Sequence, residues 1–286
     1  AGAAEPVGAT AKARMLGEAV ASAEAMIAAA QEHSVMLMYA ENWVYAPAVQ
    51  RALSLSRDAR GTILEIRAEE SHSGSHASYA REWRLAGGGA LIRLGAHPLG
   101  AALYIKRQEG LARDGRPIGV RSVTAEVSDV TRVPAFQAEE TKWLATGWQD
   151  VETWATAILT FEDGTHATIV SSDAVLGGLT DRLELYLSNA RVACDLTHNS
   201  LVQAYAPDPG VFASTYLAEK LETKAGWSYP SIDEDLMLGY PQELRDFCSA
   251  VIEGRAPLSD GQLGLEVVRA TYAAYRSAEE GVRVML

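Results

Sequence analysis

The sequence predicts an α+β fold in which a large, mostly antiparallel open sheet has helices on one face. Consecutive segments with strand patterning fill the middle of the 286-residue chain, and helical segments frame them. The turn signals Glu162-Asp163-Gly164 and Ser188-Asn189 separate alternating segments, so the neighbouring strands should form hairpins. A sheet of hairpins needs cover on one face only, which agrees with the small number of helices.

The N-terminal segments have a different pattern. Apolar residues at helical spacing, such as Met15 and Ala19, predict a helix over residues 10–33 that Thr10 starts. Residues 35–40 are apolar on both alternations, which predicts a strand covered on both faces. A helix followed by such a strand is half of an α/β repeat, and the other half should precede it in the chain.

The remaining elements follow in order. A short helix after Pro47 runs to Arg57, and residues 88–106 are apolar at helical spacing, which predicts one long buried helix. Two helices close the chain over residues 241–253 and 260–280, the second capped by Ser259 or Asp260. Strands are predicted over residues 62–68, 120–130, 153–162, 165–172, 183–188, 190–196 and 200–206.

Composition narrows the functional classes. The formal net charge of -12 argues against nucleic acid as a partner, because such binding requires clustered Lys and Arg. Two distant cysteines, Cys194 and Cys248, give neither a disulfide framework nor a metal pair. Charges interrupt every apolar stretch before it reaches the length of a membrane span. We therefore expect a cytoplasmic protein with no membrane partner.

The segment Trp83 to His97 carries the strongest chemical signal. Gly87-Gly88-Gly89 precedes a helix, so the backbone could approach a ligand closely and offer free N–H groups. His97 follows, and its ordinary pKa near 6.5 suits proton exchange with a substrate hydroxyl. The alternative is a histidine that only forms hydrogen bonds in the core. Trp83 is a further candidate for substrate contact.

This segment resembles the Gly-Gly-Gly-x-Leu-x-x-x-Gly-x-His signature of the Gfo/Idh/MocA family. Residues 38–49 are similar to the family's last Rossmann strand and the turn after it, and residues 240–281 to its terminal helices. The resemblance implies an oxidoreductase with a Rossmann domain for NAD or NADP and a C-terminal substrate domain. It makes residues 1–45 the remnant of the Rossmann domain and 46–286 the substrate-binding and oligomerisation domain. It also makes His97 the expected catalytic residue.

The sequence departs from the family in several places. No G-x-G-x-x-G turn that could cradle a pyrophosphate occurs in the chain. Glu5-Pro6 stands near the position of the family's Glu-Lys-Pro motif, without the lysine. Arg93 replaces an aspartate four residues before His97, and Gly100 stands where aspartate is common. Arg93 could bind a carboxylate or phosphate of the substrate, or could form a structural ion pair.

Other polar segments could line the same site. Glu41, Asn42, Trp43 and Tyr45 follow the predicted strand at residues 35–40, where α/β proteins bind ligands. We expect all four to contact substrate, and Glu41 and Asn42 to contact the cofactor as well. An equally compatible alternative is that the aromatic residues only fill the junction between the two domains.

The loop after the strand at 62–68 holds two histidines. His72 and His76 could form hydrogen bonds with substrate. Two histidines at H-x-x-x-H spacing bind a metal ion most readily on a helix, so no metal site is predicted in this loop. The acids of residues 148–152 and Asp173 are expected to be solvated, as acids in turns usually are.

The sequence thus predicts the substrate-binding portion of an NAD(P)-dependent oxidoreductase for a sugar, polyol or related secondary alcohol, inactive by itself. The open sheet face predicts a homodimer or homotetramer. The alternative is a non-catalytic carbohydrate-binding or oligomerisation module without a cofactor domain. A hydrolase or lyase that uses nicotinamide as a transient oxidant also fits the resemblance.

Overall fold

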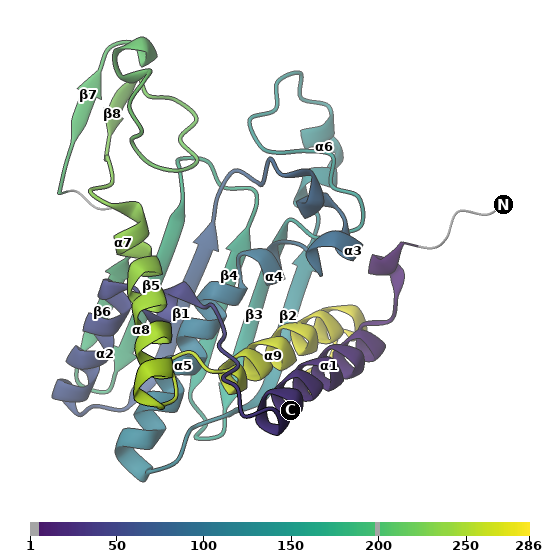
Figure 1. Cartoon of the computed structure of the whole chain (residues 1–286). Helices are drawn as coiled ribbons and strands as arrows, with labels where there is room; N and C mark the ends of the chain where they lie inside the picture. Colours follow the sequence, from purple (N-terminus) through teal and green to yellow (C-terminus); the bar gives the residue numbers. More distant parts are fainter. Residues whose placement is uncertain (1–5, 198–200) are drawn as a thin grey trace.

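The computed structural model describes residues 6–197 and 201–286, and its main feature is one twisted sheet with helices packed on a single face (Figure 1). The strand order is β6-β5-β1-β4-β3-β2-β9, and a two-stranded ribbon, β7-β8, stands apart from it. The strands are β1 Ile63–Ser71, β2 Val120–Ser128, β3 Trp154–Phe161, β4 His166–Ser172, β5 Thr180–Leu187, β6 Arg191–Asp195, β7 Ala204–Ala206, β8 Gly226–Ser228 and β9 Val284–Met285.

The helices lie over one face of the sheet (Figure 1). Helix α5 packs on β1 and β4, α9 packs on β2, and α1 lies along α9. The α-helices are α1 Lys12–Glu32, α2 Pro47–Ala59, α3 Trp83–Ala86, α4 Ala90–Arg93, α5 Ala96–Asp114, α6 Pro134–Gln137, α7 Glu234–Leu238, α8 Tyr240–Glu253 and α9 Gly261–Glu280. The predicted α+β class, with a mostly antiparallel sheet covered on one face, is confirmed.

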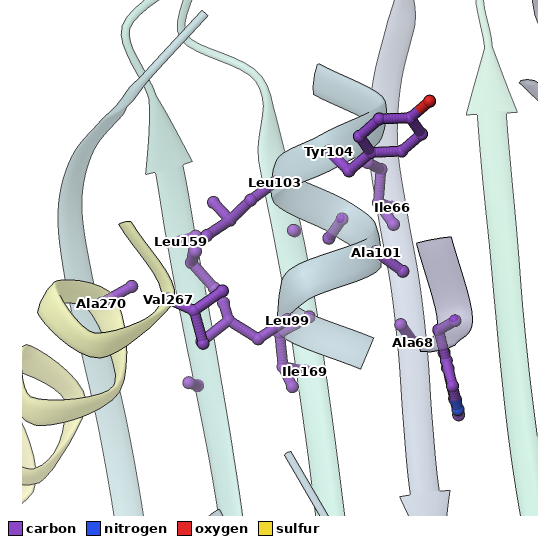
Figure 2. Close-up of a cluster of buried hydrophobic side chains, with 14 of the residues drawn as sticks. Ile66, Ala68, Leu99, Ala101, Leu103, Tyr104, Leu159, Ile169, Val267 and Ala270 are labelled. Atoms are coloured by element: carbon purple, nitrogen blue, oxygen red, sulfur yellow. The ribbon is translucent and has the colours of Figure 1, made fainter. Parts of the chain in front are cut away.

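The core lies between this helix layer and the sheet. Ala101 of α5 lies beside Ile66 and Ala68 of β1, and Leu103 of the same helix points toward Leu159 of β3 (Figure 2). These residues are buried because alternate side chains of a strand point to the same face, and here every second position is apolar. The packed face therefore follows directly from the alternation in the sequence.

The centre of the sheet contains its one parallel pair among the described strands. β1 runs parallel to β4, from Glu65 opposite His166 to Ser71 opposite Ser172, and antiparallel to β5 on its other side. The other pairs of the seven-stranded sheet are antiparallel. β1 thus lies between β5 and β4 in the interior of the sheet.

Two predicted elements near the N-terminus differ from the structure. Ala11, not Thr10, is the N-cap of α1, and no side chain caps it. The segment 35–40 is not a buried strand: Val35 is 63% exposed and Met36 is 40% exposed, and the segment forms one isolated bridge, Met38 to Asp260. A strand requires a neighbour for its hydrogen bonds, and none of the described strands lies beside this segment.

The long helix predicted over residues 88–106 is also interrupted. The chain turns between α4 and α5 at Leu94-Gly95, where the N–H of Gly95 donates to the carbonyl of Ala90. A Cβ on Gly95 would lie 2.4 Å from the carbonyl oxygen of Leu91, so this turn requires glycine. The chain changes direction at this break, and His97 lies in the first turn of the next helix, α5.

The other predicted elements are confirmed with shifts of a few residues at their ends. Asp260 is the N-cap of α9, where its side chain accepts a hydrogen bond from the N–H of Leu263. The predicted strand at 200–206 is shorter, since β7 begins at Ala204, and Ser200 lies outside the described residues. Nothing in the fold tests the boundary at residue 45, which stays a prediction. Across the described ranges, no helix has both the length and the apolar character needed to cross a membrane.

Candidate active site

The glycine loop before α4 is closed by a buried carboxylate of the chain itself. Glu152 accepts hydrogen bonds from the N–H groups of Gly89 at 3.0 Å and Leu91 at 2.9 Å and from the Tyr275 hydroxyl at 2.8 Å. A Cβ on Gly89 would lie 1.9 Å from the carbonyl oxygen of Glu152, and one on Gly88 would lie 2.3 Å from the Tyr275 hydroxyl. The glycines therefore serve internal packing, and these N–H groups face Glu152, where the sequence had suggested a ligand.

His97 is paired with Glu41 across the fold. Its Nδ1 lies 3.0 Å from Oε1 of Glu41, whose other oxygen accepts a hydrogen bond from the Tyr39 hydroxyl at 3.2 Å. The Trp43 ring stacks on the imidazole with 6.4 Å between the ring centroids. Glu41 is completely buried, whereas the side chain of His97 is 30% exposed. The imidazole is thus fixed on one side and accessible on the other.

Local sequence explains how Glu41 reaches this position. It precedes the 3-10 helix η2, Asn42–Val44, and its carboxylate accepts a hydrogen bond from the N–H of Trp43. On the opposite side lies Gly100, where a Cβ would be 2.8 Å from Cγ of Glu41. The glycine that departs from the resembled family therefore makes the space that the Glu41 side chain fills.

Three more acids surround this pair. Glu70 of β1 lies directly opposite Asp181 of β5, and Glu243 lies in the first turn of α8. Asp181 is 3% exposed and Glu243 is 5% exposed. Each of the three acids has one buried oxygen with no hydrogen-bond partner among the described residues. The sequence analysis selected none of the three as a site residue.

Alternation offered a signal for two of these acids. Glu70 continues the series Ile66 and Ala68, and Asp181 precedes Leu183 and Leu185 at the same spacing. Both positions therefore belong to the face that the helices cover. A carboxylate on a core-facing position at the end of a strand is unusual, and this pattern could have identified both residues.

The cluster shifts the pKa values of its members. Burial opposes the charged imidazole of His97, but the carboxylates of Glu41 and Glu70 outweigh it and raise its pKa to about 10. Burial raises the pKa of Asp181 to about 7 against the attraction of His97. Burial, with repulsion from Glu41, likewise raises the pKa of Glu243 to about 7. His97 therefore carries a proton at neutral pH.

Arg93 forms a second buried pair, with Asp173. The guanidinium bonds to the Asp173 carboxylate, which is completely buried, and lies 5.3 Å from the centre of the Trp148 ring. Burial raises the pKa of Asp173 to about 6 although Arg93 opposes the shift. Asp173 and Glu152 were expected to be solvated, and that expectation is wrong, because both carboxylates bond to groups inside the fold.

The two histidines of the loop after β1 lie in different environments. His72 is 5% exposed, its Nδ1 accepts a hydrogen bond from the N–H of Gly74 at 2.9 Å, and burial lowers its pKa to about 3. His76 is exposed. No group of three His, Cys, Asp or Glu side chains within the described ranges is arranged to hold a metal ion. Substrate contact by either histidine stays a prediction.

Asn42 and Tyr45, which were also predicted to contact substrate, form hydrogen bonds within the chain. Asn42 donates to the carbonyl of Leu238 at 2.9 Å. The Tyr45 hydroxyl donates to Asp246 and accepts from the N–H of Ser259, both at 3.0 Å. These bonds attach the segment after residue 40 to the α7–α8 region and to the loop before α9.

Trp83 is 6% exposed and packs on Tyr275 with 4.7 Å between the ring centroids. Of the candidate site residues, the structure thus brings together His97, Glu41 and Trp43. Roles of the others in binding substrate or cofactor stay predictions.

In this open-sheet α+β domain, a partly exposed histidine in the first turn of α5 is paired with a buried carboxylate before η2, an arrangement that can exchange a proton with a small molecule. Residues 54–193 match the family described as "GFO/IDH/MocA C-terminal domain". With the fold and the solved structures below, this match shows that residues 54–193 are similar to the Gfo/Idh/MocA C-terminal domain, in agreement with the sequence signature. A search of curated proteins gave no match.

Solved structures share the fold over nearly the whole chain. GenD2 from gentamicin A biosynthesis, in complex with NAD, is 27% identical over 99% of this chain and 77% of its own, with a TM-score of 0.75. Aldose-aldose oxidoreductase from Caulobacter crescentus, complexed with glycerol, is 23% identical over 93% and 69%, with a TM-score of 0.63. Scyllo-inositol dehydrogenase from Lactobacillus casei is 14% identical over 93% and 68%, with a TM-score of 0.66.

The described residues do not form a site for the nicotinamide dinucleotide that this family implies. No strand in residues 6–197 and 201–286 leads through a Gly-rich turn into a helix whose N–H groups could bind a pyrophosphate. The Gly87–Gly89 loop is occupied by Glu152. Glu41 and Asn42, expected to contact the cofactor, are held by His97 and Leu238.

Proposed function

We propose that this chain is the substrate-binding portion of an NAD(P)-dependent oxidoreductase that acts on a secondary alcohol of a sugar, a polyol or a related compound. The observation that carries the proposal is the His97–Glu41 pair, fixed on the Glu41 side and accessible on the other. GenD2 is in complex with NAD and the Caulobacter enzyme with glycerol, which supports a nicotinamide cofactor and a polyhydroxylated substrate for this chain.

In this proposal, His97 handles the proton of the reacting hydroxyl group. Glu41 contacts Nδ1, which leaves Nε2 to face the substrate oxygen. When the carbonyl is reduced, the imidazolium gives its proton to the substrate oxygen. In the reverse direction the imidazole must first lose that proton, and the neutral ring then takes the O–H proton of the alcohol. A nicotinamide would exchange the hydride with the substrate carbon. Glu41 is a positioning residue that orients the ring and favours its protonated form.

The test uses the protein made from its native gene. Binding of myo-inositol and glucose is followed by ligand-observed NMR, and their oxidation by the appearance of NADH or NADPH. We expect His97→Gln to abolish turnover and to weaken binding of the sugars. His76→Gln is the matched control, because His76 is exposed and outside the cluster. Equal binding and equal turnover in the wild type and His97→Gln would contradict the proposal.

A second candidate is a non-catalytic carbohydrate-binding or oligomerisation module. One observation favours it: the position of the family's aspartate carries Arg93, which is bound to the buried Asp173. Sugar binding that depends on His97, with no turnover under any condition, would support this candidate.

Two further expectations accompany the leading proposal. We expect the protein to act in the cytoplasm, in line with the unpaired Cys194 and Cys248. We also expect copies of the chain to associate through the open sheet face.

A further inference from the structure

The surroundings of His97 contain more negative than positive groups. Glu41, Glu70, Asp181 and Glu243 act electrostatically on one another or on the imidazole. The positive group that acts on Glu70, Asp181 and Glu243 is His97 in each case. One imidazolium cannot balance four carboxylates, so in the absence of a ligand some of these acids must be protonated.

The arrangement of these acids is costly for the fold alone. Glu70 and Asp181 are direct cross-strand neighbours, a placement that destabilises a sheet when both charges are alike. Oε2 of Glu70, Oδ1 of Asp181 and Oε2 of Glu243 are buried without a hydrogen-bond partner among the described residues. Native proteins pair nearly all buried polar atoms, so the unpartnered oxygens of the neighbouring residues Glu70 and Asp181 indicate a missing partner that donates hydrogen bonds.

The partner fits an ammonium group better than a metal ion. A metal ion requires several ligands that converge at short distances, and no group of three His, Cys, Asp or Glu side chains has that geometry in the described parts of the chain. An ammonium group has three donors that can reach carboxylates at hydrogen-bond distance in several directions. Tyr240, which is 44% exposed and whose pKa is raised by burial and by Glu70, offers an aromatic surface at the same place.

We propose that the site takes an amine-bearing sugar or cyclitol, whose protonated amino group is bound by Glu70 and Asp181 while a neighbouring hydroxyl faces His97. This inference rests on the proposed function, because the hydroxyl is the one that His97 acts on. The bound cation offsets the like charges of Glu70 and Asp181 and supplies donors to their unpartnered oxygens. It also opposes the positive charge of His97, so the imidazole releases its proton more readily and can serve as the base.

The test compares three probes on the full chain at neutral pH: glucosamine, glucose and N-acetylglucosamine. The acetyl group removes the positive charge of glucosamine and keeps the nitrogen. Dissociation constants are measured by ligand-observed NMR for the wild type, Asp181→Asn and Asp58→Asn. Asn replaces Asp181 without a change of shape and removes a like charge opposite Glu70, so this variant should fold. Asp58 is exposed on α2 and provides the matched control.

We expect glucosamine to bind the wild type at least about tenfold more tightly than either neutral sugar, a difference of about 1.4 kcal/mol. The preference should fall to near one in Asp181→Asn and persist in Asp58→Asn. Equal binding of all three sugars by the wild type would overturn this inference and leave the proposed function standing. Binding of none of them would overturn both. A preference that survives in Asp181→Asn, or displacement of glucosamine by Mg²⁺ or Ca²⁺, would also overturn the inference.

Discussion

Replacement of Arg93 by Met should destabilise the fold, because it leaves a buried carboxylate without its partner. Asp173 is completely buried, and the Arg93 side chain is 11% exposed. Removal of one member of a buried ion pair costs about 3–5 kcal/mol. Met retains most of the apolar stem of Arg93, so the loss of packing should be small. We expect Arg93→Met to lose about 3–5 kcal/mol of unfolding free energy at pH 8.

The loss should depend on pH in a defined direction. Burial raises the pKa of Asp173 to about 6 in the folded protein, above its ordinary value of 3.8. Its contribution to stability is thus fully present below pH 3.8 and is lost as the pH rises through about 6. At pH 5 the folded variant holds Asp173 protonated, so the loss should shrink to the cation–π contact with Trp148, about 1 kcal/mol.

Urea unfolding at pH 5 and pH 8 measures both values, read from the midpoint at an unchanged m value. The double variant Arg93→Met/Asp173→Asn is the control, because it leaves no buried charge and should recover most of the loss at pH 8. The reasoning is refuted if Arg93→Met loses the same free energy at both pH values, or if the double variant is no more stable than the single one.

Three further predictions concern the site and the sheet. Gly100→Ala places a Cβ 2.8 Å from Cγ of Glu41, so it should lower the free energy of unfolding, measured in urea, by about 1–3 kcal/mol. The control is Gly17→Ala, where the new Cβ lies in open space on α1 and should raise that free energy by about 0.5–1 kcal/mol. The interaction of His97 with Glu41 should stabilise the fold fully below pH 6.5, and this stabilisation should be lost as the pH rises through about 10. NMR titration of the His97 imidazole should show a lower pKa in Glu41→Gln than in the wild type. An unchanged His97 pKa would disprove the pairing. Ile158, 46% exposed on β3, should lie in an interface, so Ile158→Lys should halve the mass found by light scattering, and a monomeric wild type would contradict this.

The sequence predicted those features of the fold that depend on local patterns. β3 and β4 begin and end within two residues of the predicted bounds, because alternation and the Glu162-Asp163-Gly164 turn lie within the segment itself. The strand predicted over residues 35–40 was wrong, because an apolar segment forms a strand only where a neighbouring strand provides backbone hydrogen bonds.

The candidate site was predictable in part. His97 was identified from its signature, but its partner Glu41 is 56 residues away, and only the fold shows that Gly100 makes room for it. Solvation of an acid depends on what packs over its turn, so Glu152 and Asp173 could not be recognised as buried from their neighbours in sequence. Cross-strand register, which places Glu70 against Asp181, is likewise set by tertiary structure.

The parallel pairing of β1 with β4 has a consequence for the order in which the protein folds. Both neighbours of β1, β4 and β5, come about a hundred residues or more after it, whereas β2 to β4 are successive in the chain and can pair early. The entropy cost of closing these long loops must be met before the distant strand pairs can form their stabilising contacts, so β1 should join the sheet late. During synthesis β1 has to wait for β4 and β5 to leave the ribosome, and the acids opposite His97 meet only at that final step.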